Sequence, residues 1–156
     1  MAGSSLAIEA EHPDKPDIRR LIDDLNQHLL TLYSVDQCHH LTIEEMAEPD
    51  VTFWVVRRDG QAIGCGAMRR IDASTGEVKR MYTVPASQGQ GIGKRMLRTI
   101  EAEARRMGLK SLVLETGNEQ PAAMHLYRTE GYSRRGPYLD YPDDGVSVFM
   151  EKQLSD

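Results

Sequence analysis

The stretch QGQGIGK, residues 88–94, decides how the rest of this chain is interpreted. Glycines occupy positions 89, 91 and 93, directly before a run whose apolar residues recur at helical spacing. Glycine is costly inside regular structure, so three at alternate positions indicate a backbone that turns sharply or approaches a ligand closely. Free N–H groups at the start of a helix, together with the helix dipole, are suited to phosphate. The stretch therefore predicts an anion-binding loop between a strand and a helix.

Two common phosphate-binding loops do not fit this stretch. A Walker A loop ending at Gly93 and Lys94 would need glycine and serine or threonine where the chain has Gln88 and Arg95. A Rossmann fingerprint needs its third glycine three positions after the second, where the chain has Lys94. The loop also follows an antiparallel meander rather than opening a βαβ unit.

Periodicity along the chain predicts a mixed α+β sheet. Helices are expected over residues 14–33, 42–48, 92–107 and 120–131, with Asp17 and Thr42 as candidate N-caps for the first two. Strands are expected over residues 5–10, 51–59, 61–72, 77–85, 110–116 and 146–154. The turn at Asp59 and Gly60 joins two of these strands as a hairpin.

Length and charge limit the class of protein. The chain has 156 residues, which predicts one domain over 1–156 with a core of about 6–154. Its 19 basic and 24 acidic residues give a net charge of -5, which argues against a nucleic-acid partner. No apolar run is long enough for a membrane span, and the first residues do not have the pattern of a secretory signal. We therefore expect a cytoplasmic protein with no membrane partner.

The cysteines predict neither a disulfide framework nor a metal site. Two cysteines, Cys38 and Cys65, are too few to staple a chain of this length. Cys38 stands beside His39 and His40, but this spacing matches no common zinc pattern and no second ligand cluster exists. We expect no metal.

Residues 88–93 match the pattern Gln/Arg-x-x-Gly-x-Gly/Ala, and their context extends the match. MYTVP precedes the loop, and Ala123, Leu126, Tyr127, Gly131 and Tyr132 follow it in order. The chain thereby resembles the GNAT superfamily of acyl-CoA N-acyltransferases, and it is similar to a bacterial subgroup labelled as Hpa-type or indole-acetate acetyltransferases. The resemblance implies a single-domain GNAT fold. In that fold, a mixed, mostly antiparallel sheet of about six to seven strands is flanked by helices, and a splayed central strand pair binds acyl-CoA.

The resemblance also implies where acetyl-CoA binds as co-substrate. The pantetheine arm would pair with the backbone of the strand before the loop, and the loop would hold the pyrophosphate. Asn118 resembles a residue that contacts the arm, although its distance in sequence from Tyr127 is larger than usual. The implied cofactor-binding residues are Met81, Tyr82, Thr83, Gln88, Gly89, Gln90, Gly91, Ile92, Gly93, Lys94 and Asn118.

The implied chemistry is direct attack of a primary amine, on a small molecule or peptide, on the acetyl thioester. Glu77 stands at the family's general-base position and would remove the proton that keeps an alkyl ammonium unreactive at neutral pH. Tyr127 stands at the general-acid position and would protonate the leaving thiolate. The aromatic and acidic segment 138–144 would form part of the acceptor pocket opposite the first two helices, and it favours a cation with an apolar body.

Two other functions fit the same pattern. A non-catalytic sensor would bind acyl-CoA without releasing CoA on any amine. An interaction protein would use the sheet for dimerisation and have no affinity for acetyl-CoA. A homodimer is compatible with each of these functions.

Overall fold

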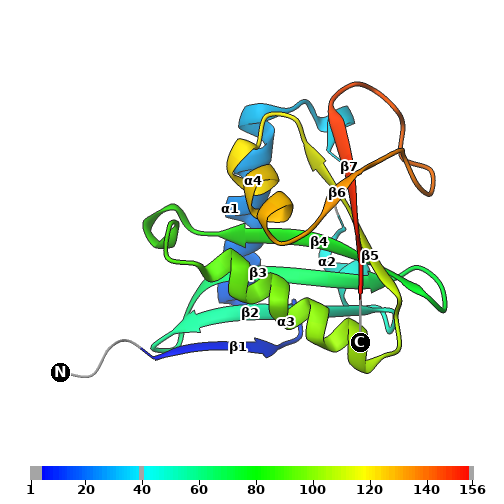
Figure 1. The fold of residues 1–156 in the computed structure, drawn as a ribbon. Helices are drawn as coiled ribbons and strands as arrows, with labels where there is room; N and C mark the ends of the chain where they lie inside the picture. Colours follow the sequence, from blue (N-terminus) through cyan, green and yellow to red (C-terminus); the bar gives the residue numbers. More distant parts are fainter. Residues whose placement is uncertain (1–4, 39–40, 155–156) are drawn as a thin grey trace.

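The computed structural model describes residues 5–38 and 41–154 (Figure 1). Within this part of the chain, a seven-stranded sheet has the order β1-β2-β3-β4-β5-β7-β6. The strands are β1 (Leu6–Ala10), β2 (Val51–Arg58), β3 (Gln61–Arg70), β4 (Thr75–Thr83), β5 (Ser111–Gly117), β6 (Ser133–Arg135) and β7 (Ser147–Gln153). Only β4 and β5 pair in parallel, so the predicted mixed, mostly antiparallel α+β sheet is confirmed.

Helices cover both faces of the sheet. Figure 1 shows α3 (Ile92–Arg106) in front of the sheet and α1 (Pro16–Leu32) behind it. The other helices are α2 (Ile43–Met46) and α4 (Pro121–Thr129), with short 3-10 turns η1 (Val35–Gln37) and η2 (Pro85–Ser87). One buried apolar cluster lies between the sheet and the side of α3, and a second lies on the side of α1 and α2. Each apolar helical stripe thus covers one face of the sheet, as its periodicity predicts.

Local signals fixed most element ends correctly. Thr42 caps α2 in a reciprocal capping box with Glu45, as expected. The prediction for Asp17 is wrong, because Lys15 is the N-cap of α1 and makes no side-chain capping bond. Asp17 instead accepts a hydrogen bond from Arg57 at 2.7 Å, a partner 40 positions away that no local pattern could reveal.

The central strand pair separates part-way along its length. β4 and β5 are paired from Thr75 and Ser111 to Val78 and Leu114, and beyond this point each continues only with its other neighbour. The β3–β4 register shifts in the same region, where Arg80 has a φ of 57°. A residue in this left-handed conformation bulges the strand and bends it, which opens the predicted splay.

No described helix is long and apolar enough to cross a bilayer.

Candidate active site

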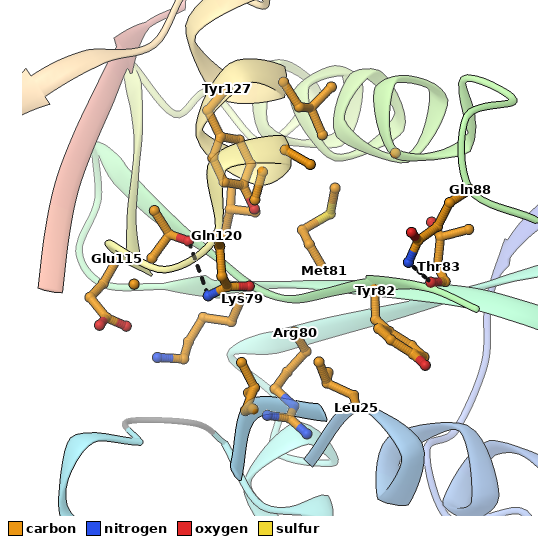
Figure 2. A pocket seen from close by; sticks show the side chains of 18 of the residues that line it. Leu25, Lys79, Arg80, Met81, Tyr82, Thr83, Gln88, Glu115, Gln120 and Tyr127 are labelled. Atoms are coloured by element: carbon orange, nitrogen blue, oxygen red, sulfur yellow. Dashed lines mark hydrogen bonds between the residues drawn. The ribbon is translucent and has the colours of Figure 1, made fainter. Parts of the chain in front are cut away.

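A cavity of about 450 Å³ opens where β4 and β5 separate. Its walls come from the inner face of α1, residues 78–83 of β4, the glycine loop, the end of β5 and the start of α4. Figure 2 shows β4 crossing this space, with α4 on one side and α1 on the other. The cavity therefore lies on both sides of the unpaired edge of β4, where an extended ligand could add to the sheet.

The glycine loop forms one end of the cavity. Gly89 and Gly91 have φ values of 80° and 77°, and open space surrounds the position of a Cβ at each. Backbone conformation alone therefore requires glycine there. Gly93 has a different reason, because its Cβ would lie 3.0 Å from Leu126 of α4. Gly91 caps α3 without a side-chain bond, so the first-turn N–H groups of this helix face the cavity without a capping side chain.

Six of the seven predicted loop residues line the cavity. They are Gln88, Gly89, Gly91, Ile92, Gly93 and Lys94. Gln90 does not line it, and its side chain accepts a hydrogen bond from Arg58 at 2.7 Å. The Gln88 side chain turns back to donate to the carbonyl of Thr83 at 3.0 Å (Figure 2). Anion contacts at this loop would therefore come from backbone N–H groups and the Lys94 ammonium.

The residues predicted to follow the pantetheine arm are only partly brought together. Met81, Tyr82 and Thr83 line the cavity along β4. Asn118 does not line it, because its exposed side chain donates to the carbonyl of Gly145 at 3.2 Å. Gln120, two residues later, lines the cavity instead, where its amide donates to the Thr116 hydroxyl at 3.4 Å.

Tyr127 enters the cavity from α4, on the side of the sheet opposite α1 (Figure 2). Its ring is 6% exposed and makes an edge contact with the ring of Tyr132, at 5.9 Å between centroids. Burial, and to a smaller extent the charge of Glu115, raises the pKa of Tyr127 above its ordinary value. The side chain therefore keeps its proton at neutral pH, and its hydroxyl is a weaker acid than that of a free tyrosine.

Glu77, the predicted base, lies outside the lining of this cavity. Its side chain is fully buried and accepts hydrogen bonds from Arg69 at 2.8 Å, Tyr138 at 2.6 Å and Tyr141 at 2.7 Å. The Lys79 ammonium lies 3.7 Å away. Of these four partners of Glu77, only Lys79 lines the first cavity.

Sequence reasoning did not single out Glu115, which lines the cavity at the end of β5. It is half-buried, and its charge contributes to the pKa shifts of four other lining residues. These are Tyr33, Cys38, Lys79 and Tyr127. Figure 2 shows Glu115 and Lys79 projecting to the side of α1, across β4 from Tyr127. The one available signal was a carboxylate directly after the buried apolar run Leu112–Leu114 of β5.

A second cavity, of about 550 Å³, lies beside the segment 138–144. Lys79 lines both cavities, and Tyr141 and Asp140 line the second. Asp144 instead shapes the loop, because its carboxylate accepts backbone N–H bonds from Val146 at 2.9 Å and Ser147 at 3.0 Å. The residues of the predicted acceptor segment that line the second cavity are Leu139, Asp140, Tyr141 and Pro142, and none of the segment lines the first cavity.

The two cysteines differ in position. Burial raises the pKa of Cys65 to about 12, and its thiol donates to the carbonyl of Arg80 at 3.2 Å. Cys38 lines the first cavity, and burial raises its pKa too. His39 and His40 lie outside the described residues, and no group of metal-ligating side chains occurs among those that are described.

A parallel strand pair that splays beside a glycine loop at the start of a helix is the architecture of an acyl-CoA-dependent acyltransferase fold. The model of the acetyltransferase (GNAT) family matches residues 17–132. An IAA acetyltransferase of Azospirillum brasilense is 42% identical over 151 residues, which cover 96% of this chain and 99% of the relative. The chain belongs to the GNAT family of acetyltransferases.

Solved structures agree with this assignment. A Klebsiella pneumoniae protein assigned as an acyl-CoA N-acyltransferase is 35% identical with a TM-score of 0.82, covering 96% of this chain and 98% of the other. The PaiA N-acetyltransferase of Thermoplasma acidophilum, solved in complex with coenzyme A, has a TM-score of 0.72 at 19% identity, covering 96% and 99%. The second likeness concerns the fold alone.

Proposed function

We propose that this enzyme transfers an acetyl group from acetyl-CoA to a primary amine in a single ternary complex. The observation that carries the proposal is the position of Tyr127 and Glu115 in one cavity, on opposite sides of the unpaired edge of β4. With an acid and a base on opposite sides of the bound thioester, the base can deprotonate the attacking amine and the acid can protonate the leaving thiolate.

The binding half of the proposal uses backbone groups. The unpaired edge of β4 would hydrogen-bond the pantetheine arm along Met81, Tyr82 and Thr83. The N–H groups of residues 89–94 and the Lys94 ammonium would hold the pyrophosphate at the start of α3. The backbone near Met81 would donate to the thioester oxygen as charge develops on it.

The chemical half uses two side chains. The amine nitrogen attacks the thioester carbon, the carbon–sulfur bond breaks, and the acetyl group is left on nitrogen as an amide. A base takes the proton that the amine loses, and the Tyr127 hydroxyl would give a proton to the leaving sulfur. We assign the first role to Glu115, because it lines the cavity and its charge acts on four other lining groups.

Glu77 stays a prediction as the base, and its geometry favours a positioning role. Its carboxylate holds Arg69, Tyr138 and Tyr141, and it lies 3.7 Å from the Lys79 ammonium, which faces the cavity. A proton could reach Glu77 only by relay through these partners. Its removal should therefore disturb the wall of the site more than the proton transfer itself.

Two measurements test the proposed function. Calorimetry should show that acetyl-CoA binds, and a thiol reagent should detect CoA release over a panel of amines, polyamines, amino acids, aminoglycosides and peptides with free N-termini. Binding without release on any acceptor would favour the sensor and overturn the enzyme. The location in the cytoplasm and the homodimer are further predictions, for fractionation and light scattering.

A further inference from the structure

Arg80 is a buried cation with few partners among the described residues. Its side chain is 7% exposed, and its only side-chain hydrogen bond within the described residues runs from Nη2 to the amide oxygen of Asn26. Its Nε is buried without a partner, and no ion pair involves this residue in the described part of the chain. A guanidinium has five N–H donors and is always charged, so most of its binding capacity is unused.

The guanidinium lies at the cavity and not in the packed core. Arg80 lines the first cavity together with Leu25, Leu29 and Tyr33 of the α1 side. Figure 2 shows the side chain leaving β4 toward α1, beside Leu25. A desolvated cation in such surroundings costs several kcal/mol unless an anion joins it. The cavity is the open space from which that anion can come.

Glu115 provides the opposite charge in the same cavity. The charges of Glu115 and Arg80 both act on Cys38, because the Glu115 carboxylate raises the pKa of its thiol and the Arg80 guanidinium lowers it. The acceptor side of the cavity thus carries the Glu115 carboxylate beside β5, the Lys79 ammonium from β4 and the Arg80 guanidinium beside α1. Apolar leucines line the cavity next to the guanidinium. A ligand that matches this arrangement carries both an amine and a carboxylate.

We propose that the acceptor is a small amino carboxylic acid, such as a free amino acid, whose carboxylate binds Arg80 while its amine faces Glu115. This inference rests on the proposed function and narrows its acceptor. The acceptor carboxylate and the Arg80 guanidinium would form a charge-assisted, bidentate ion pair in a site with little water. In this geometry arginine distinguishes a carboxylate from a neutral group. Leu25 and Leu29 would contact the rest of the acceptor.

Matched acceptors test the inference. Free amino acids and their carboxamides have the same amine position but differ in the carboxylate, and kcat/KM is compared per unit of neutral amine across a pH series. We expect the wild type to prefer the acid by on the order of 100-fold, the effect of one desolvated charge pair. In Arg80→Met, this preference should fall close to one, because kcat/KM for the acid should fall far more than kcat/KM for the carboxamide. Arg80→Lys should retain part of the preference, since it keeps the charge without the planar fork.

Controls separate binding from folding. Arg128→Met removes an equal charge from an exposed position of α4 that does not line the cavity, so it should keep the preference. Acetyl-CoA affinity should stay at the wild-type value in Arg80→Met. If that variant does not fold, Asn26→Ala, which removes only the hydrogen bond that orients the guanidinium, should lower the preference several-fold.

A readout without turnover completes the test. The amino acid should raise the Tm of the CoA-bound wild type and not that of CoA-bound Arg80→Met. Equal use of acids and carboxamides by the wild type, or a full preference in Arg80→Met, would overturn this inference and leave the acetyltransferase intact. Acetyl-CoA binding with no CoA release on any amine would instead overturn the proposed function itself.

Discussion

Replacing each candidate base by its amide separates a catalytic role from a structural one. Glu115→Gln changes a half-buried group that lines the cavity, whereas Glu77→Gln changes a fully buried carboxylate with three hydrogen-bonded partners. Both variants replace a carboxylate by an amide of nearly the same size, one in β4 and the other in the neighbouring strand β5. We expect Glu115→Gln to change mainly the pH profile of the rate and Glu77→Gln to lower mainly the stability of the fold.

The kinetic effect of Glu115→Gln follows from the ionisation of the acceptor. An alkyl ammonium with a pKa of about 10.4 has roughly one molecule in 1000 neutral at pH 7.4, and this fraction rises about tenfold per pH unit. Without a base, the rate should follow that fraction and rise roughly 100-fold between about pH 7.4 and 9.4. At neutral pH, the loss should be on the order of 10²- to 10⁴-fold.

The stability effect belongs to Glu77→Gln. This variant removes the charged partner of Arg69 and places an amide NH₂ among the hydroxyl donors of Tyr138 and Tyr141. Breaking a buried pair costs about 3–5 kcal/mol, and the 27% exposure of the Arg69 side chain lowers this to about 2–3 kcal/mol. For a chain of this size, the Tm should fall by roughly 4–12 °C.

The assay is the same CoA-release measurement from pH 6.5 to about 9.5, with differential scanning calorimetry of each variant beside it. Glu115→Gln should show the steep rise and a small change in Tm. Glu77→Gln should keep the wild-type pH profile and lose thermal stability. The reverse pattern, with the steep rise in Glu77→Gln only, would refute our assignment and establish Glu77 as the base.

Four further changes test separate parts of the structure. Tyr127→Phe keeps the ring and removes the hydroxyl, so kcat should fall roughly 10- to 1000-fold with acetyl-CoA affinity unchanged by calorimetry; a wild-type kcat with chemistry rate-limiting would make it a packing residue. Gly91→Glu places a charge and a Cβ on a residue with a φ of 77°, so acetyl-CoA binding should collapse while circular dichroism stays native. In Gly117→Ala the new Cβ would lie 2.0 Å from the hydroxyl oxygen of Tyr33, so urea unfolding should show a loss of about 3 kcal/mol, and an unchanged midpoint would contradict the packing. Burial raises the pKa of Tyr132, so the folded state holds that phenol proton above pH ~10, where an unfolded tyrosine loses it; stability should fall as pH rises beyond that value, and less steeply in Tyr132→Phe.

Local sequence signals were sufficient for the glycine loop and for most of the elements, but they did not reveal the short strand β6. The glycines at 89 and 91 are required by their own backbone angles, and the capping box at Thr42 involves residues three apart. Such features depend on near neighbours, so a sequence displays them directly. Asp17 of α1 is the contrasting case, because its carboxylate binds Arg57 of strand β2, which is distant in sequence, and does not cap the helix.

The facing of residues along β4 could not be predicted in the same way. Strict alternation places Val78 and Tyr82 on one face of a strand, because they are four positions apart. In the structure, Val78 belongs to the apolar cluster beside α3, and Tyr82 packs against the cluster beside α1. The bulge at Arg80 inserts a residue and reverses the facing beyond it.

The bulge in β4 places energetically unfavourable features of Arg80 directly beside the cavity. Arg80 combines a positive φ, a buried charge and an unpaired Nε, each of which is unfavourable by itself. Yet the β4–β5 pairing ends two residues before it, and the unpaired edge and the cavity begin there. A sequence selected for stability alone would place an apolar residue or a glycine at this position. An arginine at this position is explained by our proposal, because the acceptor carboxylate would pair with the guanidinium. Its binding energy would then offset the free-energy cost of the buried charge in the empty site.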